Sequence, residues 1–129
     1  MEVIEQIELK NITVSLLEGD IIKLKVKEHS LIDESDIREA QVAKKNLVGN
    51  KRYAVLFVTP KYGTMTKEAR DYSASEEANE NAIVKAVVLN GLAMRIIANF
   101  FINYNKPPVE HRLFETEEKA LEWLYSFLK

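Results

Sequence analysis

Apolar and polar residues alternate along two short stretches near the amino terminus. Residues 12–16 place isoleucine, valine and leucine at every second position, and residues 22–26 do the same with lysines between them. A period of two is typical of a half-buried strand. Residues 18–20 supply a turn between the two stretches, with a glycine that can take a positive φ. The pattern predicts an antiparallel hairpin, and the lysines of its second strand favour an edge strand protected against pairing with other chains.

Continuous apolar runs indicate strands that are buried on both faces. Residues 53–58 and 83–89 form such runs, which are typical of the central strands of a parallel sheet. A last short strand is expected at residues 110–114, after the rigid pair Pro107 and Pro108.

Helical spacing and helix-start residues predict four helices. They are residues 37–47, a short helix that opens at Thr64 or Thr66 and runs through Tyr72, residues 92–104, and a helix that follows Thr116. Residues 73–81 either continue the short helix or break it and restart at residues 75–77. Three residues are alternative caps for the first helix, namely Asp33, Ser35 and Asp36. The last helix has its inner stripe at Ala120, Leu121, Leu124, Tyr125 and Leu128.

The order of these elements defines the expected fold. Two strands are followed by helices and strands in alternation, β-β-α-β-α-β-α-β-α. This order predicts an α/β domain over residues 1–129, with a single-layer, mostly parallel sheet of five strands, an antiparallel amino-terminal hairpin and four helices.

Composition removes several functional classes. The 129 residues include 20 acidic and 18 basic side chains, a net charge of −2, which gives no general attraction for nucleic acid or acidic membranes. The absence of cysteine excludes thiol nucleophiles, zinc–thiolate sites and iron–sulfur clusters. Because glycine-rich phosphate motifs and nucleophile elbows are also missing, we expect no enzyme activity, no cofactor and no metal site.

The apolar stretch 82–102 has the length of a membrane span but contains Lys85, Asn90 and Arg95, which are costly at bilayer depth. A buried strand that leads into a buried helix explains the stretch better. Without an export signal at the amino terminus, a cytoplasmic protein is expected.

The turn at residues 59–66 is the strongest candidate for a functional site. Ligands of open α/β sheets bind beyond the carboxyl ends of the strands, where helix amino termini present free N–H groups. The turn and the helix after it offer hydroxyls, positive charge and an aromatic ring that suit an anion or a partner, at Thr59, Lys61, Tyr62, Thr64, Thr66 and Arg70. The alternative is that the threonines cap the helix and the basic side chains are simply solvated.

Arg95 is a second candidate, because it is the only charge in the apolar segment 92–104. A charge in apolar surroundings needs a partner, which can be a ligand, a carboxylate of the same chain or a partner subunit. The segment also has more apolar surface than one face of a sheet can cover, which favours a homodimer interface or a lid over an apolar pocket.

The element order resembles the STAS domain, the fold of bacterial anti-sigma-factor antagonists and sulphate-transporter tails. The carboxyl-terminal half is similar to small uncharacterised bacterial STAS-like proteins. The resemblance covers roughly residues 7–129, and the segments that carry it are 56–58, 66–70, 95–100, 106–107 and 114–124. It implies a non-enzymatic regulatory or protein-interaction module.

One departure from that family concerns the phosphorylated serine of its antagonists, which lies in an Asp-Ser-Ser-Gly-like turn. The equivalent turn here, residues 59–66, offers only threonines. We therefore expect a module without the usual serine phosphoswitch, which forms a homodimer or binds a protein partner. The alternative is a carrier or sensor of a small apolar or anionic ligand, held between helix 92–104 and the sheet.

Overall fold

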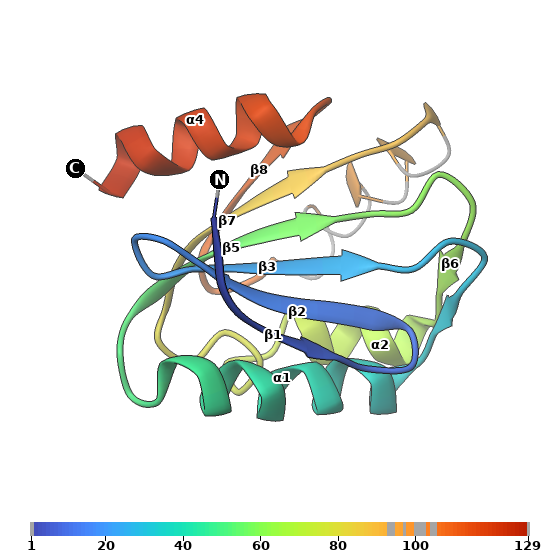
Figure 1. The fold of residues 1–129 in the computed structure, drawn as a ribbon. Coiled ribbons are helices and arrows are strands. Elements are labelled where there is room, and N and C mark those ends of the chain that lie inside the picture. The colour runs from blue at the N-terminus through green and yellow to red at the C-terminus, as the bar shows by residue number, and fades with distance from the viewer. Residues whose placement is uncertain (1, 93–94, 97, 100–102, 104–105, 129) are drawn as a thin grey trace.

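A six-stranded sheet with helices on both faces forms the protein in the computed structural model, which describes residues 2–92, 95–96, 98–99, 103 and 106–128 (Figure 1). The strands, in their order across the sheet, are β1 (Val3–Glu8), β2 (Ile12–Leu17), β3 (Ile21–Val26), β5 (Tyr53–Val58), β7 (Ala82–Val88) and β8 (Glu110–Phe114). One face is covered by α1 (Glu34–Val48) and α2 (Lys67–Ser73), and the other by α4 (Glu117–Leu128).

The sheet is mixed. The predicted hairpin is confirmed, since β2 and β3 pair antiparallel from Ile12 opposite Val26 to Leu17 opposite Ile21. The next three neighbouring pairs, β3–β5, β5–β7 and β7–β8, are parallel. A separate parallel pair, β4 (Leu31–Ile32) and β6 (Thr64–Met65), joins the loops that follow β3 and β5.

Two expectations about the strands were wrong. The main sheet has six strands and not five, because β1 adds antiparallel to β2. The strand β3 is internal, because it pairs with β2 on one side and with β5 on the other, so its lysines do not protect an edge. Lys23 instead forms an ion pair with Glu117 in the first turn of α4, at 2.6 Å.

Three helices have defined bounds among the described residues, where four were expected. In the expected fourth, residues 92, 95, 96, 98, 99 and 103 are helical, and the other positions from 93 to 105 lie outside the described residues. Asp33 is the N-cap of α1: its side chain accepts from the Asp36 N–H, and the Asp36 side chain accepts from the Asp33 N–H, each at 3.0 Å. This reciprocal capping box decides among the three alternative caps.

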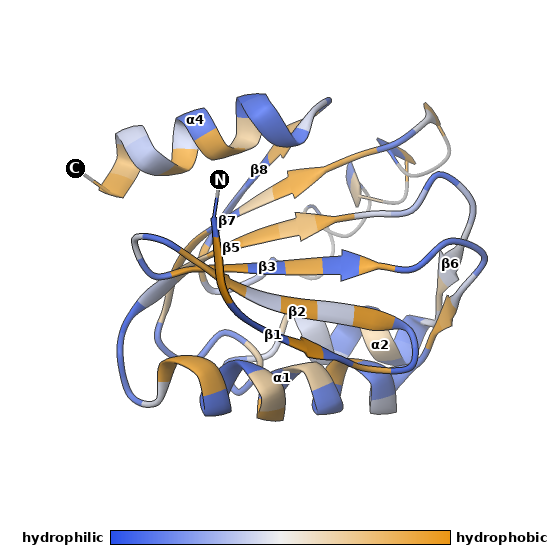
Figure 2. Cartoon of the chain, viewed as in Figure 1, coloured by the Kyte–Doolittle hydropathy of each residue, from blue (hydrophilic) through white to orange (hydrophobic). Residues whose placement is uncertain are grey.

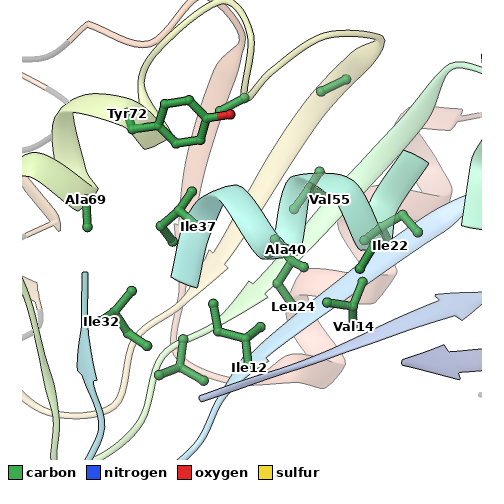
Figure 3. Close-up of a cluster of buried hydrophobic side chains, with 14 of the residues drawn as sticks. Ile12, Val14, Ile22, Leu24, Ile32, Ile37, Ala40, Val55, Ala69 and Tyr72 are labelled. Carbon is green, nitrogen blue, oxygen red and sulfur yellow. The ribbon is translucent and has the colours of Figure 1, made fainter. Parts of the chain in front are cut away.

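The alternation of side chains along each strand divides the core between the two faces of the sheet. On one face, strand residues such as Ile12, Ile22 and Val55 pack against Ile37 and Ala40 of α1 (Figure 3). The other face packs against α4, with these buried residues among its core: Leu56, Val84, Ala86, Ala120 and Leu124. Figure 2 shows β5 and β7 hydrophobic along most of their length, as expected for central strands. Within the described part of the chain, no helix combines the length and apolar character that a bilayer span requires.

Candidate functional site

The loops that follow β3, β5 and β7 lie at one edge of the sheet, its carboxyl edge (Figure 1). This is the edge at which open parallel sheets bind ligands. The loop 59–66 is attached there to the segment after β3: Thr64 N donates to Ser30 O at 3.0 Å, and Thr66 N donates to Ile32 O at 2.9 Å. The topology therefore brings two loops that are far apart in the sequence into one surface.

Thr59 has a structural role at this edge. Its side chain is buried, and its hydroxyl donates to Val88 O at 2.7 Å. Asn90 donates from its backbone N–H to the same hydroxyl and from its side-chain amide to Thr59 O, at 3.3 and 2.7 Å. These bonds hold together the ends of the central strands β5 and β7.

The backbone N–H groups of Lys61 and Tyr62 already bind an anion of the same chain. Both donate to the Glu28 carboxylate, each at 3.0 Å, and consecutive N–H groups of this kind form an anion-binding nest. The bonds from Tyr62 and then Lys61 hold the pKa of the Glu28 carboxyl below its ordinary value. The His29 ring stacks on Tyr62, with centroids 5.8 Å apart. Glu28 thus occupies the backbone donors that an external anion would need.

Thr66 and Arg70 serve the local structure of α2. The Thr66 hydroxyl accepts from Ala69 N at 3.1 Å and caps the helix, which was one of the two alternatives for the threonines. The Arg70 guanidinium donates to Met65 O at 3.1 Å. Lys61, Tyr62 and Thr64 are exposed and stay available to a ligand or partner.

Replacing Thr66 by alanine is expected to lower the free energy of unfolding by about 1 kcal/mol, because the Ala69 N–H loses its acceptor. Thr66→Asp is the matched control, since a carboxylate oxygen also caps well, and it should retain most of the stability. Urea unfolding followed by circular dichroism measures both changes. Equal losses in the two variants would contradict a capping role for Thr66.

Arg95 forms an ion pair with a carboxylate of the same chain. Its guanidinium lies 3.5 Å from Glu115 Oε1, and Glu115 directly follows β8. This is one of the three partners considered for Arg95. Because both side chains are substantially exposed, the pair contributes little stability, and the guanidinium stays accessible at the carboxyl edge.

Large apolar side chains are exposed at the same edge. Four such side chains are between 57% and 73% exposed, and we call them the edge patch: Leu31, Tyr62, Leu92 and Ile96. They come from the segments that follow β3, β5 and β7 in turn, and Leu92 and Ile96 are four residues apart in helical conformation, on one face. Each of the three segments that follow β3, β5 and β7 therefore exposes at least one large apolar side chain at the carboxyl edge.

Sequence reasoning missed two buried lysines under α1. Lys44 of α1 is 5% exposed and Lys85 of β7 is 8% exposed. Burial, and then the charge of Lys85, lowers the pKa of Lys44 to about 7, and burial lowers the pKa of Lys85 to about 8. A signal was present for Lys85, which is the single charge in the apolar strand Ala82–Val88.

The ligand site predicted between segment 92–104 and the sheet involves many positions outside the described residues, as does the apolar dimer surface predicted for that segment. Both stay predictions.

Comparison with known proteins gives a family and a fold. The family model described as a domain of unknown function, DUF7793, matches residues 15–128. No curated protein matches the sequence. Among solved structures, the chain is similar to an uncharacterized protein from the DUF3478 family with a SpoIIAA-like fold, from Shewanella loihica PV-4. That similarity has a TM-score of 0.60 at 14% identity, and it covers 88% of this chain and 91% of the other. At this identity the likeness establishes the SpoIIAA-like, STAS-like fold.

Proposed function

Since the chain belongs to the DUF7793 family and is a STAS-like domain, we propose that it is a non-enzymatic regulatory module that binds a protein through the carboxyl edge of its sheet. The observation that carries the proposal is the edge patch, because large apolar side chains that stay in water favour burial against a partner. The patch lies beside the exposed Lys61 and the accessible Arg95, which add polar contacts of the kind found at an interface rim.

The charged groups of this edge support a binding role rather than catalysis. Glu28 is held by the backbone of the loop 59–66, and Arg95 is paired with Glu115. A catalytic acid or base has to reach its substrate, and the Glu28 carboxylate is already engaged by the backbone of the loop. The loop offers the exposed hydroxyl of Thr64 in place of a serine, so partner binding without the usual serine phosphoswitch is part of the proposal.

A second copy of the chain is the first partner to test. Sedimentation velocity over a range of concentrations should give a dimer for the unchanged protein. Exchanging Leu92 and Ile96 for serine should shift most of the sample to monomer at the same concentration, because the apolar contact is lost. The matched control is Val42→Ser, which changes an equally exposed side chain (61%) on α1, away from the edge, and should leave the dimer intact.

A monomer at all concentrations would contradict self-association. In that case, cross-linking of the unchanged protein in its host, compared with the double serine variant, tests for a different protein partner. The proposal fails if both proteins give the same cross-linked species.

A further inference from the structure

A small cavity lies between α1 and the sheet, on the face opposite α4. Its volume is about 20 Å³, which is room for one species of the size of a water molecule. Apolar side chains, including Leu24, Ile37 and Phe57, form much of its wall. Two of the lining residues are lysines: Lys44 reaches it from α1 and Lys85 from β7.

The ammonium groups of these lysines have few partners. Lys44 Nζ donates to Ala78 O at 3.0 Å and lies 5.5 Å from the centre of the Tyr53 ring. Lys85 Nζ lies 6.0 Å from the centre of the Phe57 ring. Among the described residues, no carboxylate forms an ion pair with either lysine. A buried ammonium without a counter-charge is unstable unless it loses its proton or gains an anion.

The titratable side chains beside the two lysines on β8 and β5, His111 and Tyr53, carry no negative charge at pH 7, and the nearby Glu80 carboxylate is paired with Lys45 at 3.0 Å. On β8, His111 stands opposite Lys85 in the strand register, and its Nδ1 lies 2.9 Å from Val109 O. Burial, and then the charge of Lys85, lowers the pKa of His111 to about 4, so its ring is neutral at pH 7. On β5, the Tyr53 hydroxyl donates to Glu80 O, and burial raises the pKa of this tyrosine to about 12. At pH 7 the positive charge of the cavity lies mainly on Lys85, whose pKa is about 8, and Lys44, whose pKa is about 7, is protonated in about half of the molecules.

We propose that this cavity binds one small monovalent anion, of the size of chloride, between the ammonium groups of Lys44 and Lys85. Three features support this: two cationic hydrogen-bond donors line one water-sized cavity, no internal carboxylate neutralises them, and the apolar wall strengthens the attraction between opposite charges. The small volume of the cavity favours a monatomic anion over a large organic anion such as gluconate. The site is independent of the proposed partner surface, which lies at the carboxyl edge.

Thermal unfolding at pH 7 tests the site, with sodium chloride compared against sodium gluconate at equal ionic strength. Chloride should raise the Tm with the logarithm of its concentration above the Kd, by about 5 °C at ten times the Kd, whereas gluconate is too large to enter. Lys85→Met should abolish the chloride-specific rise. Lys25→Met, which removes an exposed lysine of β3, should keep it. If unchanged protein shows no chloride-specific rise, or Lys85→Met keeps the rise, the proposal is overturned.

A second measurement uses only the unchanged protein, so its result does not depend on whether any variant folds. Carbon NMR of the lysine side chains of the unchanged protein gives the apparent pKa of each buried ammonium in chloride and in gluconate. Because the anion binds the protonated form, chloride should raise the two lowest lysine pKa values. Equal values in the two salts would overturn the proposal even if every substitution unfolded the protein.

Discussion

Replacing Leu124 by alanine is expected to lower the free energy of unfolding by about 2–5 kcal/mol. The Leu124 side chain is fully buried, and with Ala120 it forms the buried part of α4. It packs against the face of the sheet that carries Leu56 and Val84. These are residues of central strands, which cannot collapse readily into the space left by the missing methyl groups, so we expect a cavity term in addition to the lost burial.

The matched control for this prediction is Phe127→Ala in the same helix. Phe127 is 45% exposed and contacts the Trp123 ring, with centroids 5.6 Å apart, so its loss should cost about 1 kcal/mol or less. Urea unfolding followed by circular dichroism gives both values, and the m-value should stay constant. If Leu124→Ala is as stable as the unchanged protein, α4 does not depend on this contact for its position.

The central part of the fold could be predicted from the sequence because its signals are local. An apolar run such as residues 53–58 has no favourable place except between two covered faces, and the structure buries β5 accordingly. Asp33 and Thr66 carry similarly local information, since a helix cap depends on residues only three positions away.

The strand β1, which forms one side of the sheet, could not be predicted in this way. Most side chains of β1 are exposed, and the strand is held to β2 through backbone pairing, which leaves almost no pattern in the sequence. The parallel pairing of β3 with β5, which makes β3 internal, joins segments about 30 residues apart and also leaves no local pattern. The alternating lysines of β3 agree equally well with an edge and with an internal strand whose polar positions pair with a helix, as Lys23 does with Glu117.

In the candidate site, too, the features with a local signal could be predicted and the contacts between distant residues could not. The exposed loop after β5 was predicted, but Glu28 lies 33 residues from Lys61, and no local pattern indicates that its carboxylate fills the nest. The buried lysines differ, because a local signal existed. Lys44 stands seven residues after Ile37 and four after Ala40, on the apolar face of α1, and Lys85 interrupts an apolar strand. A charge at a core position is evidence for a site, and this holds for Lys44 and Lys85 as it does for Arg95.

The stability of the protein should rise with pH between 7 and 10 in a buffer whose anion is gluconate. In the unfolded chain both buried lysines have the ordinary pKa of 10.5, whereas folding lowers that of Lys44 to about 7 and that of Lys85 to about 8. Across this range the unfolded state therefore binds more protons than the folded state, and the free energy of unfolding increases with pH. Each lysine contributes up to about 1.4 kcal/mol per pH unit once the pH exceeds its folded-state pKa.

The neighbouring titratable groups, His111 and Tyr53, do not change the slope of stability between pH 7 and 10. The low pKa of His111 gives a rise of the same sign, but between pH 4 and 6.5. Tyr53, whose pKa is raised to about 12, acts in the opposite direction and only above pH 10, because the unfolded tyrosine then loses its proton first.

Urea unfolding at a series of pH values measures the slope, and two variants assign it. Lys85→Met should raise the stability at pH 7, because it removes a buried ammonium that has no carboxylate partner among the described residues. It should also remove about half of the slope of stability against pH between pH 8 and 10. Lys25→Met changes an exposed lysine and should leave the slope as it is. A flat or falling profile in the unchanged protein would mean that both ammonium groups keep their protons when the chain folds. The burial of two unpaired charges under α1 would then need a counter-ion even in gluconate.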